Sequence, residues 1–567
     1  MMNSKRSKKR IKTGIFIVVL VAVIGLLNIF LIAEAKKIAR NRLIKHVGLV
    51  TDGLYSLDFG NLDINLQNAS VDLKDITLNL NQKRLNELYR VDSLPKFYGY
   101  LKIDKISLEG VAFIYRKKPE NRKLLCRRID IIRPQITVID NAQGIKSKHP
   151  KDTVVKVPNK TPYEMIAPYF ELLSVSKIRM EEGVLHFYSE NKQDTTRIIL
   201  HNIHFQADEF RIDSLSDKNL HCLYSQDFQL AVDSTAIHFP NHLYTLRSGK
   251  IEVDLNDSLL QINDVSYVSK IPKWEFAYRD PKHSDWMDLR IGTIELKGLH
   301  IQKWMTEKRL FLDSLFVSSV HFRNYKNQKI ITPPKKVPMI YETVQHFPVP
   351  FSINYVKASD LNVFYEELAK KGAKPGLIKF TKMEGIFDGF TNIVSSPKQV
   401  NKLTATGRLM NRGLIQAELS FPVDPTNDQA RITGTLGPMN MISFNSIIEP
   451  MAPPLRIKSG FIEGLDFDIV GGKEKADIDM CLYYNHLSVD IGLLSLIADG
   501  LIERDNPKPG KELRRVHAEH IRDPYHSSFN YLWKIYFAGI KETLGYTEKR
   551  QKNIEWAIKE YHTLKKK

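Results

Sequence analysis

The sequence has few cysteines and lacks the short motifs that mark common catalytic sites. Its three cysteines, Cys126, Cys222 and Cys481, are widely scattered among 567 residues and offer neither a disulfide framework nor a paired metal-ligand spacing. One disulfide or three small buried thiols both remain open. His517 and His520 form H-x-x-H without an evident carboxylate partner, and no HExxH, GxSxG elbow, Walker loop or GxGxxG helix opening occurs. The sequence therefore predicts no enzyme, no metal and no cofactor.

Long uncharged apolar runs are also scarce, and only one is long enough to span a bilayer. Residues 13–33, TGIFIVVLVAVIGLLNIFLIA, are 21 residues without a charge, or about 31 Å as a helix. The small-x-small sequence at residues 33–35 makes a cleaved signal peptide the rival interpretation, but such peptides usually have an apolar region of only about 7–15 residues. We predict a transmembrane anchor at 13–33, and a basic segment at 1–12 that stays cytoplasmic while the rest is exported.

Acidic residues are in deficit, with 64 Asp and Glu against 83 Lys and Arg, which gives a net charge of +19. Such an excess favours anionic partners, either nucleic acid or acidic lipid head groups. Because most of the chain is predicted to leave the cytoplasm, the sequence argues against nucleic acid. Lipid remains the better match.

One apolar pattern, Φ-x-Φ-x-x-Φ-x-Φ, recurs along the chain. Alternation with a period of two predicts a strand with one buried face, but the two-residue step in the middle would reverse that face unless the chain bulges or bends there. We expect each copy to be a kinked strand, or two short strands, with one apolar face. Copies begin at Leu57, Val71, Leu101, Ile129, Leu173, Ile198, Leu260, Leu289, Leu310 and Leu455, with weaker ones at Phe351 and Ile378.

The copies also form a larger duplication. In each half, two copies precede a proline-bearing insert and two copies follow it, as expected for an array whose units stack on their neighbours. We predict a mostly β fold at 51–499, a long curved antiparallel sheet, with a connecting helix at 34–50. Some 20–25 strands would extend roughly 100–120 Å. Helical inserts are predicted near 161–172, 337–346 and 438–450.

The tail at 500–567 changes character. A polar, proline-bearing linker precedes a helical stripe, and a second helix is predicted at 548–564. The stripe could pack on its own protein, cap the end of the sheet or lie on a membrane. Its apolar face comprises Phe529, Leu532, Trp533, Tyr536, Phe537 and Ile540.

The stretch FNSIIEPMAPPLRIKSGFIEGLDFDI, followed by YYNHLSVDI, together with the anchor and the repeated pattern, resembles the AsmA-like proteins of diderm bacteria. These belong to a wider group of bridge-like lipid-transfer proteins. The resemblance extends to about Asp499 and excludes the tail. It implies an inner-membrane, single-pass protein whose periplasmic U-shaped β-groove shelters phospholipids and supports their transport between the inner and outer membranes. It carries over no catalytic residue.

An apolar groove is physically suited to that role, because each exposed acyl CH₂ costs about 0.8 kcal/mol in water. The alternative for the same residues is plain core packing in a periplasmic scaffold, or an outer-membrane protein assembly factor, that carries no lipid. At the predicted length one copy would need a partner in the outer membrane or would act as a shuttle. The candidate lining residues are Leu101, Ile103, Ile106, Leu108, Val111, Phe113, Leu289, Ile291, Ile294, Leu296, Leu455 and Ile457.

Overall fold

A computed structural model describes residues 36–545, 552 and 556, except 66, 92–93, 115–121, 142–161, 192–193, 217–223, 240–242, 281–283, 331–335, 454, 491–501 and 527. These residues are mostly β, with 24 strands, and divide into two compact units, Met1–Val265 and Ser266–Lys567. The segments predicted as cytoplasmic (1–12) and transmembrane (13–33) lie outside the described residues. Within the described residues, no helix is both long and apolar enough to cross a membrane.

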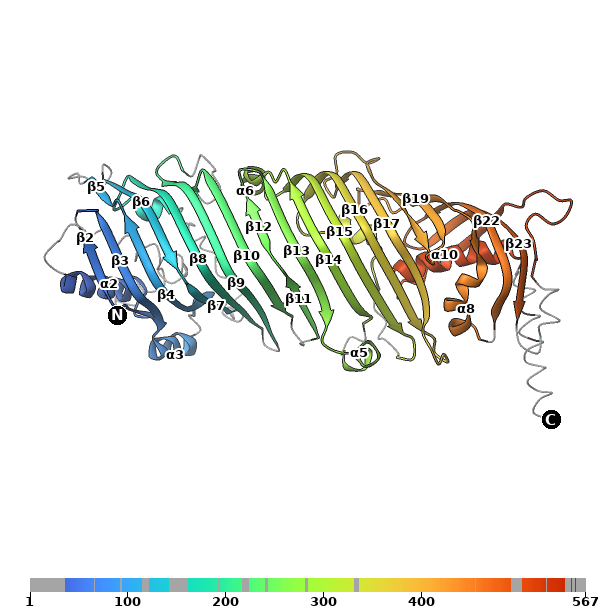
Figure 1. Ribbon diagram of the computed structural model, residues 1–567, viewed down its shortest axis with the longest axis horizontal. Coiled ribbons are helices and arrows are strands. Elements are labelled where there is room, and N and C mark those ends of the chain that lie inside the picture. The colour runs from blue at the N-terminus through green and yellow to red at the C-terminus, as the bar shows by residue number, and fades with distance from the viewer. Residues whose placement is uncertain are drawn as a thin grey trace. The chain divides into compact units, whose positions relative to one another are not determined.

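The first unit consists of strands with short helices at its beginning and in its connections (Figure 1). Helix α2 covers most of the segment predicted as a connecting helix. The elements are α2 (Lys36–Val50), β1 (Tyr55–Asp58), β2 (Leu62–Asn65), β3 (Ser70–Leu80), α3 (Gln82–Arg90), β4 (Phe97–Glu109), β5 (Ala112–Ile114), β6 (Lys123–Ile132), β7 (Gln135–Asn141), α4 (Pro162–Ile166), β8 (Leu172–Asn191), β9 (Asp194–Ile212), β10 (Asp227–His238), β11 (Tyr244–Ser248), β12 (Ile251–Asp254) and β13 (Leu259–Ser269).

The second unit has the same character and ends in a long helix. Its elements are α5 (Lys273–Arg279), β14 (Trp286–Lys297), α6 (Ile301–Glu307), β15 (Leu310–Asn327), α7 (Ile340–Gln345), β16 (Phe351–Leu368), β17 (Gly376–Thr391), β18 (Val400–Leu409), β19 (Gly413–Pro422), β20 (Ala430–Leu436), β21 (Met439–Asn440), the 3₁₀ helix η5 (Met441–Phe444), α8 (Asn445–Met451), β22 (Arg456–Gly471), β23 (Lys475–Asp490), β24 (Val516–Ile521) and α10 (Ser528–Thr543).

The sheets are mixed, so the prediction of a purely antiparallel sheet is wrong. Strand β8 pairs in parallel with β6 and β7, and β16 pairs in parallel with β15. Both parallel pairs follow one of the duplicated inserts, at 142–171 and 328–350. An insert this long can return the chain to the end where the previous strand began, and parallel pairing requires such a crossover.

The repeated pattern forms kinked strands that keep one apolar face. In β3, Val71, Leu73, Ile76 and Leu78 are all buried, whereas the two residues between the apolar pairs are exposed. The second of those middle residues, Asp75, has a left-handed φ of 55°. Four other copies repeat this conformation, at Arg133, Asn202, Asp264 and Lys382, with φ between 49° and 52°. Asn and Asp adopt this region more readily than most side chains, and the extra residue restores the buried face.

In two strand pairs the neighbouring strands make the step at the same level, so their pairing register survives it, whereas β17–β18 and β22–β23 show register shifts. In the first unit, Leu73 pairs with Ile106 and Ile76 with Ile103, without a shift between the two pairs. In the second, Ile291 pairs with Val320 and Ile294 with Val317. The faces of adjacent strands therefore reverse together, and the apolar residues remain aligned across the sheet.

The tail departs from its prediction in one respect. Residues Val516–Ile521, in a tail predicted to consist of a linker and helices, form strand β24 and pair with β23. Helix α10 follows, whereas the second helix predicted at 548–564 lies almost wholly outside the described residues. Short helices also occur in the three predicted inserts, as α4, as α7, and as η5 with α8.

Each unit has its own buried core. The first core joins α2 and the residues around α4 to strands β1–β9. The larger core of the second unit joins α7, α8 and α10 to β17–β24. A smaller buried cluster in the same unit lies on β15 and β16 and comprises Leu312, Phe351, Ile353 and Val356. Cys126 and Cys481 are buried and carry free thiols, and burial raises the pKa of the Cys126 thiol to about 11.

Candidate functional site

One apolar row crosses the whole second unit. Residues that pair across neighbouring strands point to the same face, so the register identifies a continuous row over ten strands, about 43 Å at roughly 4.8 Å per spacing. We call it the central row: Ile294, Val317, Ala358, Gly385, Ala405, Ala417, Gly434, Phe467, Met480 and Val516.

The middle of the central row is made of small residues. From β16 to β20 it consists only of alanine and glycine. The adjacent row on the same face, the flanking row, is bulky: Leu296, Leu315, Val356, Phe387, Leu403, Leu419, Ile432, Ile469 and Ile478. A line of small side chains therefore lies beside a line of large ones, and neighbouring side chains reach over two of its glycines: a Cβ added at Gly434 would lie 2.6 Å from the Phe467 ring, and one at Gly385 would lie 3.3 Å from Leu403. The repeated pattern counts large apolar residues, so sequence reasoning missed these positions.

Burial changes along the central row. Its first seven residues, from β14 to β20, are partly exposed. Its last three are buried, with Phe467 at 4%, Met480 at 0% and Val516 at 7% exposure. One row of one sheet is therefore partly open at one end and covered at the other.

Helix α10 covers the closed end. Tyr536 packs edge-on against Phe467, with ring centroids 5.0 Å apart. A Cβ added at Gly539 would lie 2.9 Å from the Met480 sulfur, so the helix can approach β23 closely because residue 539 has no side chain. Burial raises the pKa of the Tyr536 hydroxyl.

The buried line of α10 is displaced from the predicted stripe. Tyr531 and Ile535 are 3% and 2% exposed. Of the predicted face, Leu532, Trp533, Tyr536 and Ile540 are partly exposed, and all but Leu532 pack against the second core. Phe537 is 40% exposed and stacks on Trp533. The side chain of Phe529 lies outside the described residues. The helix thus packs on its own protein and caps one end of the central row.

The candidate lining residues have different surroundings in the two units. Leu101, Ile103, Ile106, Leu108 and Val111 are at most 6% exposed and belong to the first core. Phe113 is partly exposed and packs edge-on against Phe170 at 5.8 Å. In the second unit, the four predicted residues of β14 are all partly exposed, and the last of them packs against the buried cluster on β15 and β16: Leu289, Ile291, Ile294 and Leu296.

The remaining two candidates lie near α8. Ile457 is 8% exposed, and Leu455 packs partly exposed beside the same core. The Asn445 side chain holds Ile457 by donating to its carbonyl at 2.8 Å and accepting from its amide at 2.9 Å. The hydrogen bonds between Asn445 and Ile457 therefore join α8 to β22.

An apolar row in the first unit also runs from covered to partly open. It comprises Leu73, Ile106, Ile131, Met180, Phe205, Leu230 and Val253. Leu73 and Ile106 are buried, and the other five are partly exposed. An open hollow of about 390 Å³ is lined by the last four of these together with polar neighbours such as Arg179 and His204.

Buried acidic groups lie beside the open end of the second unit. Glu366 accepts hydrogen bonds from Arg323, at 3.0 Å, and from Lys273. Glu367 accepts from the Tyr365 hydroxyl at 2.9 Å. Burial, opposed by the nearby Lys326, raises the pKa of the Asp285 carboxyl. No short-range pattern indicates this cluster, because residues 365–367 meet Lys273, Asp285 and Arg323 from distant parts of the chain.

The described residues contain no group of three or more His, Cys, Asp and Glu side chains that could hold a metal. His517 pairs with Asp479 at 3.1 Å, and the ring of His520 lies 5.9 Å from that of Tyr531. The two histidines therefore contact different partners. No protein-family model and no curated protein sequence matches the chain.

Proposed function

We propose that this protein binds the acyl chains of phospholipids on its apolar sheet faces and supports phospholipid transport between the inner and outer membranes. The observation that carries the proposal is the central row, which is partly exposed over seven strands and buried under α10 over the last three. At the buried end, α10 packs on the row and removes its side chains from water. The open end has the same apolar chemistry without that degree of cover.

The small residues in the middle of the row suit an acyl chain. An extended chain is long, narrow and unbranched, so it fits along a line of alanine and glycine beside bulky neighbours. Each CH₂ that it removes from water contributes about 0.8 kcal/mol. Backbone groups between the strands are already paired, so the face can accept a ligand that offers no hydrogen bond.

The sequence supplies the cellular setting of the proposal. The apolar run at 13–33 would anchor the chain in the inner membrane, with residues 1–12 cytoplasmic and the rest periplasmic. The resemblance to AsmA-like proteins supports a groove-shaped sheet of the U-shaped kind and a role in outer-membrane homeostasis. A partner protein in the outer membrane would complete the route.

A scaffold or outer-membrane assembly factor that carries no lipid is the second candidate. The observation that favours it is that strands β3–β6 and β20–β24 contribute to ordinary buried cores. In this case the partly exposed rows would contact protein rather than lipid. Exposed apolar surface is typical of both kinds of interaction site.

Photo-crosslinking from the two faces of one strand separates these candidates. Val320→p-benzoylphenylalanine places the probe on the apolar face, and His321→p-benzoylphenylalanine places it on the opposite face of β15. After irradiation in cells, purified full-length protein is analysed for attached phospholipid by mass spectrometry. We expect lipid at residue 320 and little at residue 321. Protein adducts without lipid at residue 320 would favour the scaffold and contradict the proposal.

A further inference from the structure

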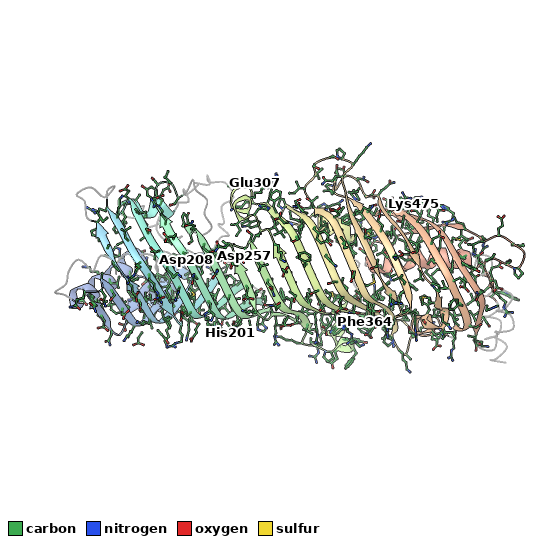
Figure 2. All side chains as sticks on the ribbon, turned by 45° about the horizontal axis from the view of Figure 1, so that its top comes forward. His201, Asp208, Asp257, Glu307, Phe364 and Lys475 are labelled. Atoms are coloured by element: carbon green, nitrogen blue, oxygen red, sulfur yellow. The ribbon has the colours of Figure 1, made fainter. Side chains whose placement is uncertain are left out.

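The strands of the second unit begin and end along two opposite sides of their sheet. We call these sides edges, and they differ in chemistry. Strands β14 and β15 are antiparallel, β15 and β16 are parallel, and β16 to β19 are antiparallel. One edge, the α5 edge, therefore holds the start of β14, the ends of β15 and β16 and the β18–β19 hairpin. The opposite edge, the α6 edge, holds α6. Figure 2 labels Phe364 toward the α5 edge and Glu307 of α6 at the other.

The α5 edge is basic. The β16–β17 hairpin, residues 369–375, carries Lys370, Lys371 and Lys374, all exposed, and no acidic residue. Lys329 and Arg412 are exposed in the neighbouring connections. Two acidic side chains at this edge do not offset them on the surface, because Glu366 and Glu367 are only 7% and 3% exposed and face partners inside the protein. A third, Glu275 of α5, pairs with Arg279 at 3.0 Å.

The α6 edge carries both signs of charge. Its exposed bases Lys303, Lys308 and Arg309 lie beside Glu307 and Asp313. Arg309 is 3.9 Å from Glu307. The excess of exposed positive charge is therefore larger at the α5 edge than at the α6 edge.

Two exposed aromatic rings lie at the basic edge. Trp274 and Tyr278 are 62% and 65% exposed. They are four residues apart and so share one side of α5, while Phe276 is fully buried and fastens the helix to the sheet. Trp and Tyr favour the boundary between acyl chains and head groups, because their rings combine an apolar body with a polar atom.

We infer that the α5 edge binds the phosphate head groups of anionic phospholipids whose acyl chains lie on the partly open apolar face. This inference rests on the proposed function and adds the class and orientation of the lipid. Lysines of the β16–β17 hairpin supply the charge for the phosphate, and the α5 aromatics lie at the level of the glycerol backbone. Head groups would then line one edge of the sheet and not the other.

The test uses the full-length protein with Val320→p-benzoylphenylalanine and fluorescent phosphatidylglycerol or phosphatidylcholine with identical acyl chains. The rim variant combines Lys370→Glu, Lys371→Glu and Lys374→Glu. The matched control combines Lys303→Glu, Lys308→Glu and Arg309→Glu, which reverses three exposed charges at the α6 edge. Melting curves of both variants verify folding, and crosslinked lipid is measured in low and high salt.

We expect unaltered protein to crosslink phosphatidylglycerol roughly fivefold more than phosphatidylcholine in low salt, which corresponds to about one lysine contact, with the preference falling in high salt. The rim variant should lose the preference, and the control should retain it. Equal loss in both variants, or loss in neither, would overturn the inference while lipid still crosslinks. If inorganic phosphate abolishes the preference for phosphatidylglycerol while another salt at the same ionic strength does not, the edge binds the free anion instead. A change in vesicle flotation alone would assign it to a bilayer surface. Absence of lipid from residue 320 in all samples would refute the proposed function itself.

Discussion

A carboxylate placed in the central row should block lipid binding without unfolding the protein. Ile294→Asp is the informative change, because Ile294 begins the row and is partly exposed. Ile106→Asp is its buried counterpart in the first unit, at 5% exposure. Both positions belong to the same repeated pattern, so comparing them isolates the effect of burial on the cost of the carboxylate.

The structure predicts different stability costs for the two substitutions. At Ile106, loss of the apolar side chain costs about 2–3 kcal/mol, and an unpaired carboxylate in the core costs several more. The sum approaches the whole stability of a domain, about 5–15 kcal/mol. At Ile294 the carboxylate keeps contact with water and less apolar area is lost, so we expect about 1–3 kcal/mol, or a fall in melting temperature of roughly 3–9 °C.

The assay measures thermal stability and bound phospholipid on the same purified full-length sample. Ile294→Asn serves as the matched control, because it has nearly the same shape as the aspartate without the charge. We expect Ile294→Asp to lose most of the lipid and to melt near the unaltered protein, with Ile294→Asn intermediate in lipid content. Cooperative unfolding of Ile294→Asp at a cost as large as that of Ile106→Asp would refute the view that this part of the row is open.

Three further experiments test backbone conformation and packing in the second unit. Lys382→Gly should stabilise the protein by about 1 kcal/mol because its φ is 51°, whereas Lys382→Val should destabilise it, both measured by denaturant unfolding. Gly539→Leu should overpack α10 by about 1–3 kcal/mol, and adding Met480→Ala should recover part of that loss; strictly additive costs would contradict the close approach of this helix. Asn401→Ala should cost about 2–3 kcal/mol, because the Asn401 amide pairs with both backbone groups of Thr391 at 2.9 Å, and a loss below 0.5 kcal/mol would show that water replaces it.

Local pattern predicted the strands that carry a copy of the repeated pattern, but it identified no copy at β10, β18, β19 or β20. The spacing of Val71, Leu73, Ile76 and Leu78 required a bulge if all four were to share a face, and Asp75 provides it. The direction of β16 relative to β15 was not accessible in this way. Strand direction depends on where the insert returns the chain, and no short-range spacing records that.

The face of α10 was displaced by one position for a physical reason. Hydropathy weights bulky apolar side chains, and it therefore favoured Phe529, Leu532 and Tyr536. A helix that approaches a strand closely does so along its smallest residues, and here Gly539 lies against Met480. Strand β24 was missed for a similar reason, because Val516 is the only large apolar side chain among the positions it turns toward the core.

Whether a copy of the repeated pattern is buried depends on which other elements pack over it, and this is a property of the tertiary structure. Leu101 and Leu289 begin copies with the same spacing, yet one is 6% exposed in a core and the other is partly exposed. Isolated apolar sheet in water invites edge pairing and aggregation. In each unit helices cover one end of the apolar row, and its remaining residues stay partly exposed. Retaining such a surface is unfavourable for a protein that works without a ligand, whereas acyl chains would remove the same surface from water. A protein partner would remove this surface from water as well, so crosslinking from residue 320 is the measurement that separates the two roles.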